Sequence, residues 1–199
     1  MEPSAVREAL VAPWRHGEHV DLKGVTIDGP LDLAGLDLTG VDFSGARFPH
    51  GLDASAARFL GLAWFRGAEF GGPARFGDAV FHNDARFEDA GFAADADFHA
   101  AEFRGIGLFD RALFKASADF AGMVGYGNFS LHEAAFEGKT GFARAEWLGG
   151  FWADGTVLPA QADFSDVEAH GRVWVRRARR GNMPLSLAET GIAFGYTYS

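Results

Sequence analysis

The chain has 199 residues, of which 20 are Phe, 27 are Gly and none is Cys, and its formal net charge is −9 at pH 7. So many large apolar rings exclude intrinsic disorder, and the length suits one ordinary domain. The lack of Cys excludes disulfides, thiol nucleophiles and Cys-based metal sites. The acidic balance argues against direct binding of nucleic acid.

The N-terminal segment, residues 1–19, is expected to form a cap. Residues 4–11 read SAVREALV, which predicts a short helix with Ser4 as its N-cap. Leu10 and Trp14 are expected to plug the structure that follows. This segment has no apolar run typical of a signal peptide, and no stretch of the chain approaches the roughly 18 apolar residues of a membrane span. We therefore expect a cytoplasmic protein.

The middle of the chain is an internal repeat. Phe recurs at alternating intervals of six and five residues, at positions 59, 65, 70, 76, 81, 87, 92, 98, 103, 109, 114 and 120. Ala or Gly stands two residues before each of these rings. The same register extends upstream to Leu22, and it resumes downstream at Phe136 and reaches Phe164. One array therefore spans 20–164, with a predicted slip at Gly125 and Leu131 and a local bulge at residues 127–129.

The mean interval of 5.5 residues fits neither a helix nor a simple amphipathic strand. It predicts a chain that turns a corner after each short segment, with the rings pointing inward. Four segments then make a coil of about 22 residues that rises about 4.8 Å, the spacing between strands. The extra residue in every second repeat over 54–120 is expected to loosen or bulge alternate corners.

The segments GVDFS, GARFP, ARFED and ADFHA carry a resemblance to a known family. Over residues 20–164 the sequence resembles the pentapeptide-repeat family. This resemblance implies an all-β fold, a right-handed quadrilateral parallel β-helix (a solenoid) with a short N-terminal helical cap and a C-terminal cap.

Residues 165–199 differ in charge from the rest of the chain. They hold five Arg, at positions 172, 176, 177, 179 and 180, against Asp166, Glu168 and Glu189, a local balance of +2. The pattern first alternates like a strand through Val173 and Val175 and then breaks at Pro184. We expect a C-terminal cap; resemblance to some family members makes a homodimer contact the alternative.

A 22-residue coil stacks equivalent residues into surface columns. One predicted column holds five acids, interrupted by Arg75 and Gly141: Asp32, Asp53, Asp97, Asp119 and Asp163. Carboxylates about 5 Å apart repel one another, so the column destabilises the fold unless solvation or function offsets the repulsion. It is either a partner-binding stripe that mimics a phosphate backbone, or a set of turn-forming and solubilising residues.

Two other predicted columns are less acidic. One holds Trp64, Arg86, Leu108, Ser130 and Trp152; its neighbour holds Glu69, Gly91, Leu113, Ala135 and Val157. Exposed apolar side chains in a row are typical of a partner or dimer surface. The alternative is that the C-terminal tail folds over them.

No motif points to catalysis, a cofactor or a metal. His16 and His19 flank Glu18 but the register places no third ligand beside them, and His82, His99 and His132 fall on different faces. The sequence contains no nucleophile elbow, phosphate loop or dinucleotide fingerprint. A smooth rod without long loops makes a poor active site, so we expect a protein that is not an enzyme.

These observations favour a non-enzymatic protein-interaction module that binds neither nucleic acid nor membrane directly. Similarity to the quinolone-resistance branch of the family implies DNA gyrase or topoisomerase IV as the partner, engaged by mimicking duplex DNA. The alternative is a scaffold or regulator with a different protein partner. A carbohydrate-active β-helix enzyme is the least favoured hypothesis.

Overall fold

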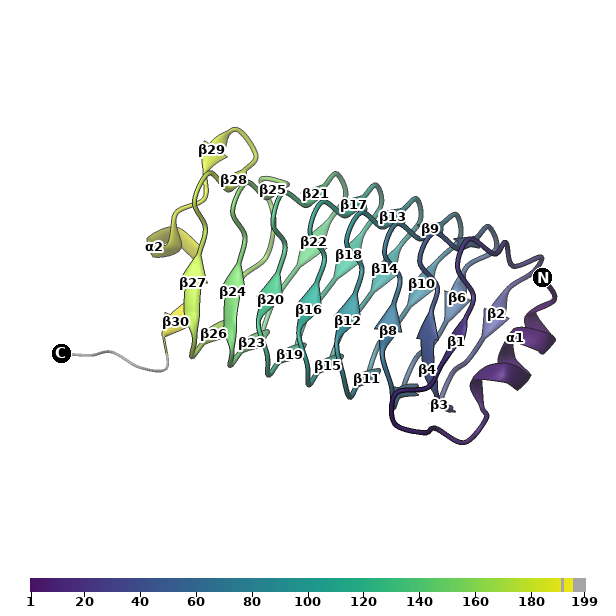
Figure 1. Ribbon diagram of the computed structural model, residues 1–199. Helices are drawn as coiled ribbons and strands as arrows, with labels where there is room; N and C mark the ends of the chain where they lie inside the picture. The colour runs from purple at the N-terminus through teal and green to yellow at the C-terminus, as the bar shows by residue number, and fades with distance from the viewer. Residues whose placement is uncertain (191, 195–199) are drawn as a thin grey trace.

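A computed structural model describes residues 1–190 and 192–194, which wind into a rod of short parallel strands (Figure 1). Four sheets form the walls of the rod, and each coil between β4 and β23 contributes one strand to each sheet. The expected quadrilateral parallel β-helix is thereby confirmed. We number the sheets I to IV by the order in which the chain first enters them.

Sheets I and II are built from strands that recur every fourth element along most of the chain. Sheet I comprises β1 (His19–Asp21), β4 (Gly40–Asp42), β8 (Ala63–Trp64), β12 (Ala85–Arg86), β16 (Gly107–Leu108), β20 (Phe129–Ser130), β24 (Gly150–Trp152) and β27 (Arg172–Trp174). Sheet II comprises β2 (Leu31–Asp32), β6 (Leu52–Asp53), β10 (Ala74–Arg75), β14 (Ala96–Asp97), β18 (Ala118–Asp119) and β22 (Thr140–Gly141).

Sheets III and IV complete the walls and include the last strands of the chain. Sheet III comprises β3 (Asp37–Leu38), β7 (Arg58–Phe59), β11 (Val80–Phe81), β15 (Glu102–Phe103), β19 (Val124–Gly125), β23 (Glu146–Trp147), β26 (Glu168–Ala169) and β30 (Ala193–Phe194). Sheet IV comprises β5 (Arg47–Phe48), β9 (Glu69–Phe70), β13 (Gly91–Phe92), β17 (Leu113–Phe114), β21 (Ala135–Phe136), β25 (Val157–Leu158), β28 (Arg179–Arg180) and β29 (Met183–Pro184).

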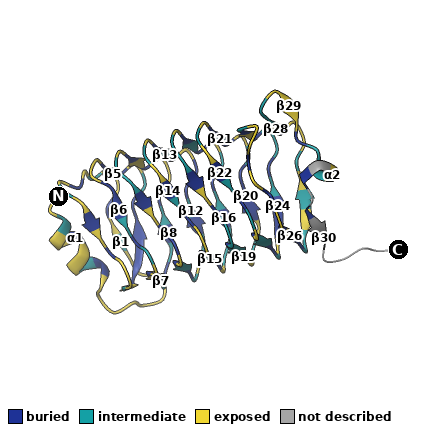
Figure 2. Cartoon of the chain, turned by 180° about the vertical axis from the view of Figure 1, so that it is seen from behind, coloured by how far each residue is buried: buried dark blue, intermediate teal, exposed yellow. Residues whose placement is uncertain are grey.

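The core of the rod is a set of Phe stacks that run along its axis. Phe92 stacks on Phe70 with ring centroids 4.8 Å apart and on Phe114 at 4.5 Å, nearly parallel in both cases. Across the interior the rings meet edge to face, as Phe87 and Phe98 do at 5.4 Å. Both arrangements are the ones that aromatic quadrupoles favour. Figure 2 shows buried and exposed residues interspersed along the walls of the rod.

Alternate corners of the coil have different backbones. After Ala54 the chain makes a turn in which the N–H of Ala57 donates to the carbonyl of Ala54 at 3.1 Å, with Ala56 at φ 56°. Ala56 therefore occupies the third position of a type II turn, which requires a left-handed backbone. Between residues 54 and 120, every five-residue interval has such a turn, whereas the six-residue intervals have no positive φ. The extra residue therefore changes the corner type without interrupting the ladders, unlike the loosening that we expected.

The predicted slip and bulge near residue 127 are wrong. Gly125 pairs in register with Phe103 and with Trp147, so the ladder of sheet III continues through it. Phe129 occupies the position two residues before Leu131, which holds Ala or Gly at each repeat from Ala57 to Ala118, and its buried ring lies 5.3 Å from the ring of Phe103. A Cβ at Gly125 would lie 3.5 Å from the Phe129 Cβ. A ring supplied from the neighbouring position thus replaces the missing one.

The N-terminal end is covered by helix α1 (Pro3–Leu10), which buries Val6 and Leu10. Ser4 is not its N-cap: Glu2 holds that position without a side-chain bond, and Pro3 opens the helix. Proline suits the first helical position because its N–H would be unsatisfied there in any case. Leu10 plugs the first coil as expected, but Trp14 remains 38% exposed. Its indole lies outside, against the corner at Gly61.

The C-terminal segment continues the coil before it leaves it. Strands β26, β27 and β28 pair in parallel with the preceding coil as far as Arg180. The chain then reverses, β29 pairs antiparallel with β28, and α2 (Leu187–Thr190) precedes β30. The division into 1–19, 20–164 and 165–199 stays a prediction, and residues 191 and 195–199 of the expected cap lie outside the described part of the chain.

Candidate interaction surface

The five acids of the predicted stripe lie in one column on the outer side of sheet II. Asp32 pairs in register with Asp53, and Asp97 with Asp119, while Asp163 bridges to Gly141. Arg75 separates the two acidic pairs, and Gly141 separates the second pair from Asp163. The 22-residue register therefore brings together all five predicted residues. We call the outer side of sheet II, with these five carboxylates, the acidic face.

Each acid of the column makes the same local hydrogen bond. The Oδ1 atom accepts the backbone N–H two residues later, at 3.0 Å for Asp32, Asp53 and Asp97 and at 2.9 Å for Asp119 and Asp163. This bond is an Asx turn, for which Asp is well suited. At Asp163 the donor is Ser165, and this hydrogen bond holds the pKa of the carboxyl below its usual range. The Oδ1 atom of every carboxylate thus stabilises the corner, and the Oδ2 atom takes no part in the turn bond.

Two arginines and one histidine approach the acidic face. The Arg7 Nη1 atom lies 4.0 Å from Asp32, and the Arg75 Nη1 atom lies 3.9 Å from Asp53. His99 Nδ1 lies 2.7 Å from Asp97, and this hydrogen bond raises the pKa of the imidazole. The N-terminal half of the column is therefore partly neutralised, whereas no cation of the described residues forms an ion pair with Asp119 or Asp163.

The acidic face carries two shallow hollows, one of about 320 Å³ lined by Asp119, Asp163 and Lys139, and one of about 220 Å³ beside Asp32 and Asp53. Beside the column of acids stands a second column, whose members are mostly small: Ala34, Ser55, Gly77, His99, Ala121, Ala143 and Ser165. A Cβ at Gly77 would lie 2.3 Å from the His99 ring, so Gly77 makes room for that ring. Small residues leave the carboxylates as the most prominent groups, which a broad partner surface can approach without steric obstruction.

The two apolar columns are also assembled by the register. Trp64 and Arg86 are neighbours in sheet I, and the guanidinium lies 5.5 Å from the indole centroid, within cation–π range. Val157 of sheet IV is 45% exposed and Trp174, the next member of the sheet I column, is 46% exposed. The described part of the tail therefore does not cover these side chains.

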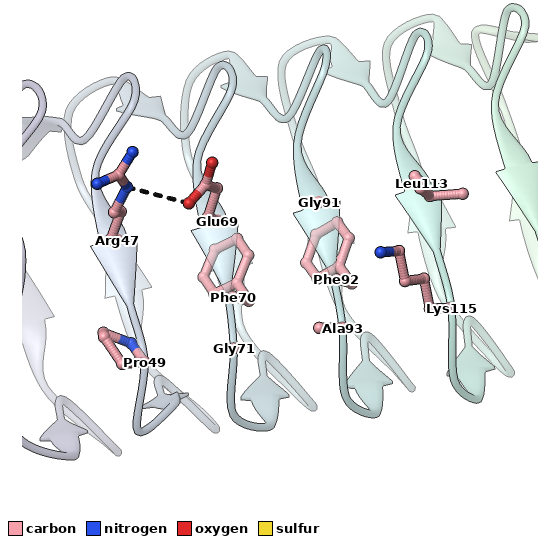
Figure 3. Close-up of a pocket in the computed structure, with 10 residues that line it drawn as sticks. All are labelled: Arg47, Pro49, Glu69, Phe70, Gly71, Gly91, Phe92, Ala93, Leu113 and Lys115. Carbon is pink, nitrogen blue, oxygen red and sulfur yellow. Dashed lines mark hydrogen bonds and ion pairs between the residues drawn. The ribbon is translucent and has the colours of Figure 1, made fainter.

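Sheet IV carries a shallow hollow of about 460 Å³ (Figure 3). Its middle lacks long side chains because Gly71, Gly91 and Ala93 stand there, with the buried Phe70 and Phe92 beneath. The ion pair between Arg47 and Glu69, with Nε and Oε2 3.0 Å apart, borders one end. Leu113 and Lys115 border the other. The hollow contains no converging acid, base or nucleophile.

The structure contains one group of potential metal ligands that was not predicted from the sequence. Among the described residues, Glu146, Glu168 and His170 place donor atoms within 4.8 Å of one another. The spacing of 22 residues between Glu146 and Glu168 predicts that they are neighbours in adjacent coils. This pair was missed because the array was expected to end at residue 164. His16 and His19 join no such group in the described structure. Nor does that part of the chain include a helix long and apolar enough to cross a bilayer.

Residues 54–102 match the model of a family described as pentapeptide repeats, with nine copies. A comparison with curated proteins gives no match. Among solved structures, the chain is similar to HetL, a pentapeptide-repeat protein involved in regulating heterocyst differentiation in the cyanobacterium Nostoc sp.. The identity is 16%, over 90% of this chain and 94% of HetL, with a TM-score of 0.22. That score is too low for the superposition to say anything about function.

Proposed function

We propose that this pentapeptide-repeat chain is a non-enzymatic protein-interaction module that binds its partner through the acidic face. The observation that carries the proposal is the column of five Asp in register along one face, each of which uses only its Oδ1 atom for the turn bond. The complementary partner surface is basic and broad.

Repulsion between the carboxylates makes the acidic face unfavourable for folding but favourable for binding a basic partner. Two carboxylates one strand spacing apart repel by about 1 kcal/mol in water. A partner that brings Lys or Arg to the column removes this repulsion and gains steering at long range, and both effects weaken with salt. Asp119 and Asp163 are the members without an ion pair among the described residues, so we place the centre of the contact there.

For the identity of the partner, we propose DNA gyrase or topoisomerase IV, with the rod mimicking duplex DNA in the cytoplasm. The regular acidic column and the slender rod support this proposal, together with the resemblance to the quinolone-resistance branch. The alternative is a scaffold or regulator that uses the same face on a different protein. A supercoiling assay with purified gyrase, with and without a fluoroquinolone, separates the two. No effect at micromolar protein excludes gyrase and leaves the acidic face open to another partner.

The role of the carboxylates is tested by substitutions that separate charge from turn geometry. In the variant Asp97→Asn, Asp119→Asn, Asp163→Asn the amide oxygen still accepts the turn hydrogen bond, while three negative charges are lost. We expect partner binding to weaken at least about tenfold, roughly 1.4 kcal/mol, and to lose part of its salt dependence. Unchanged binding would assign these acids to turns and solubility alone.

A matched control removes the same charge elsewhere. In the variant Asp21→Asn, Glu69→Gln, Glu137→Gln, the first two residues lie on sheets I and IV and Glu137 directly follows β21 of sheet IV. This triple variant is expected to bind like the original protein. A gain-of-function variant is also available. A Cβ at Gly141 would meet only the Asp119 Oδ1 atom, at 3.6 Å, so Gly141→Asp would close the gap between Asp119 and Asp163. Tighter binding by this variant would support the acidic face independently.

We also propose that the C-terminal end can associate with a second copy. Within residues 1–190 and 192–194, strand β27 has a neighbour on one side only, and Trp174 on β27 and Met183 on β29 are 46% and 68% exposed. Light scattering of the intact protein and of Trp174→Glu tests this contact. A dimer that the substitution converts to monomer supports it; a monomer at all concentrations contradicts it.

A further inference from the structure

Three side chains on the outer side of sheet III converge near the C-terminal end of the rod. Glu146 lies on β23, Glu168 lies on β26, and His170 follows β26 directly. The His170 Nε2 atom is 3.3 Å from Glu146 Oε1 and 3.4 Å from Glu168 Oε2. Because the two glutamates are register partners in adjacent coils, both carboxylates approach the same ring nitrogen from neighbouring strands.

The backbone holds all three residues in place. The N–H groups of Glu146, Glu168 and His170 donate to the carbonyls of Met123, Ala145 and Trp147 at 2.9, 3.0 and 2.9 Å. These bonds belong to the ladder that joins one coil to the next. Only side-chain rotations therefore remain to be fixed when a ligand binds, which keeps the entropic cost of ordering the group small.

Two other histidines provide an internal comparison. His99 lies between Asp97 and Asp78, and His132 lies between Asp154 and Glu133, but in both cases the two acids face opposite ring nitrogens. A single ion cannot take one nitrogen and both carboxylates in that arrangement. At His170 both acids face Nε2. Among the described histidines flanked by two acids, it alone combines an imidazole and two carboxylates around one point.

The separations suit a transition-metal ion. With bonds of about 2.0–2.1 Å, the ligand atoms of a tetrahedral Zn²⁺ site stand roughly 3.3 Å apart. The two nitrogen–oxygen distances already have that length. An imidazole with two carboxylates is a mixed nitrogen and oxygen donor set, which favours Zn²⁺ and similar ions over Mg²⁺ or Ca²⁺. Three protein ligands leave a fourth position for water.

We propose that Glu146, Glu168 and His170 form a binding site for a divalent transition-metal ion of the Zn²⁺ class. The ion is held by one oxygen of each glutamate and by Nε2 of the neutral imidazole, and any proton on that nitrogen is released to solvent. It offsets the repulsion between the two carboxylates and ties the coil of β23 to the coil of β26. The site is independent of the acidic face.

Calorimetric titration of the intact protein with Zn²⁺ alone tests the proposal. We expect saturable binding of one ion, with Mg²⁺ unable to compete, and a rise in the unfolding temperature because the ion binds the folded chain. Glu146→Gln, Glu168→Gln and His170→Ala should each weaken binding at least about tenfold. His99→Ala, His132→Ala and the double variant His16→Ala, His19→Ala are matched controls that should bind normally.

Co²⁺ provides a direct readout of the ligand set. Its visible absorption is strong in a four-coordinate site and weak in an octahedral one, so the spectrum should be intense and should be lost in the folded Glu146→Gln variant. Absence of saturable Zn²⁺ binding at about 100 μM, or equal binding by His170→Ala, overturns the proposal and leaves an ion-paired histidine. The Asp→Asn variants of the acidic face should bind Zn²⁺ normally, so the two proposals fail separately.

Discussion

The coils from Phe43 to Phe120 and those from Gly125 to Arg180 solve the same packing problem differently. In the first region nearly every inward position holds a Phe that stacks on an identical ring one coil away, as Phe65 does on Phe87 at 4.8 Å. In the second region the inward positions include Gly125, Leu131 and Ala153. The rings there come partly from the position two residues earlier, which holds Phe129 and Phe151.

This comparison shows that the volume filled in each coil matters more than the position that fills it. Phe151 lies parallel to Trp147 with centroids 3.9 Å apart. The inward position two residues later holds the small Ala153, so the large ring comes from Phe151 instead. A narrow tube has no second layer of side chains, so a ring missing at one position must be supplied from another. The following predictions test this conclusion, starting with the largest expected effect.

Removing one ring from the regular region should destabilise the rod strongly. Phe92 is fully buried between two stacked rings, and we expect Phe92→Ala to lower the free energy of unfolding by about 3–5 kcal/mol. Urea unfolding followed by circular dichroism measures this loss. Phe92→Leu is the control and should cost less. A loss under about 1 kcal/mol would show that neighbouring rings collapse into the gap.

Exchanging the two positions tests the compensation directly. Gly125→Phe alone should destabilise the protein by about 1–3 kcal/mol, because Phe129 and Trp147 already occupy the space. Phe129→Ala alone should cost about 3–5 kcal/mol. The double variant should recover much of the loss, since it moves the ring from position 129 to the inward position 125, where the regular region has Phe. A double-mutant cycle measures the coupling, and additive losses would contradict the idea of a shared volume.

The turn bonds of the acidic column should contribute a smaller effect. Asp119→Ala removes the hydrogen bond to the N–H of Ala121, and we expect a loss of about 0.5–1.5 kcal/mol. Asp119→Asn keeps an acceptor and should be close to neutral. Thermal unfolding of the pair at one ionic strength measures the difference. Equal losses in both variants would mean that the charge, and not the turn bond, stabilises the corner.

The smallest effect concerns the pH dependence of the half-exposed His99. Its hydrogen bond to Asp97 raises the pKa of the imidazole in the folded protein above the ordinary value near 6.5. A raised pKa means that the folded state binds the proton more tightly, so the added stability is fully present below the unfolded pKa. It is lost as pH rises through the folded pKa. An NMR titration should find the raised pKa, and Asp97→Asn should lower it; an unchanged value would contradict the pairing.

Most of the fold was predictable because one interval repeats. The alternation of five and six residues specifies a coil of 22, and residues 22 apart must then become ladder neighbours, as Asp97 and Asp119 do. The acidic column and both apolar columns followed from that arithmetic. The helix was also predictable, but its start was misplaced, since Ser4 and Pro3 are both compatible with the first turn and only the packing of Val6 and Leu10 selects the register.

The sequence by itself determined the coil, its four walls and the order of residues along each wall, because these depend only on the period. The tertiary structure decided what depends on volume and direction between coils. It placed the Phe129 Cβ 3.5 Å from the position of a Cβ at Gly125, so no slip was needed. It also turned one nitrogen of His170 toward both Glu146 and Glu168, while His99 and His132 divide their acids between two nitrogens. The direction of a side chain depends on its neighbours in other coils, and the repeat pattern of the sequence therefore does not predict it.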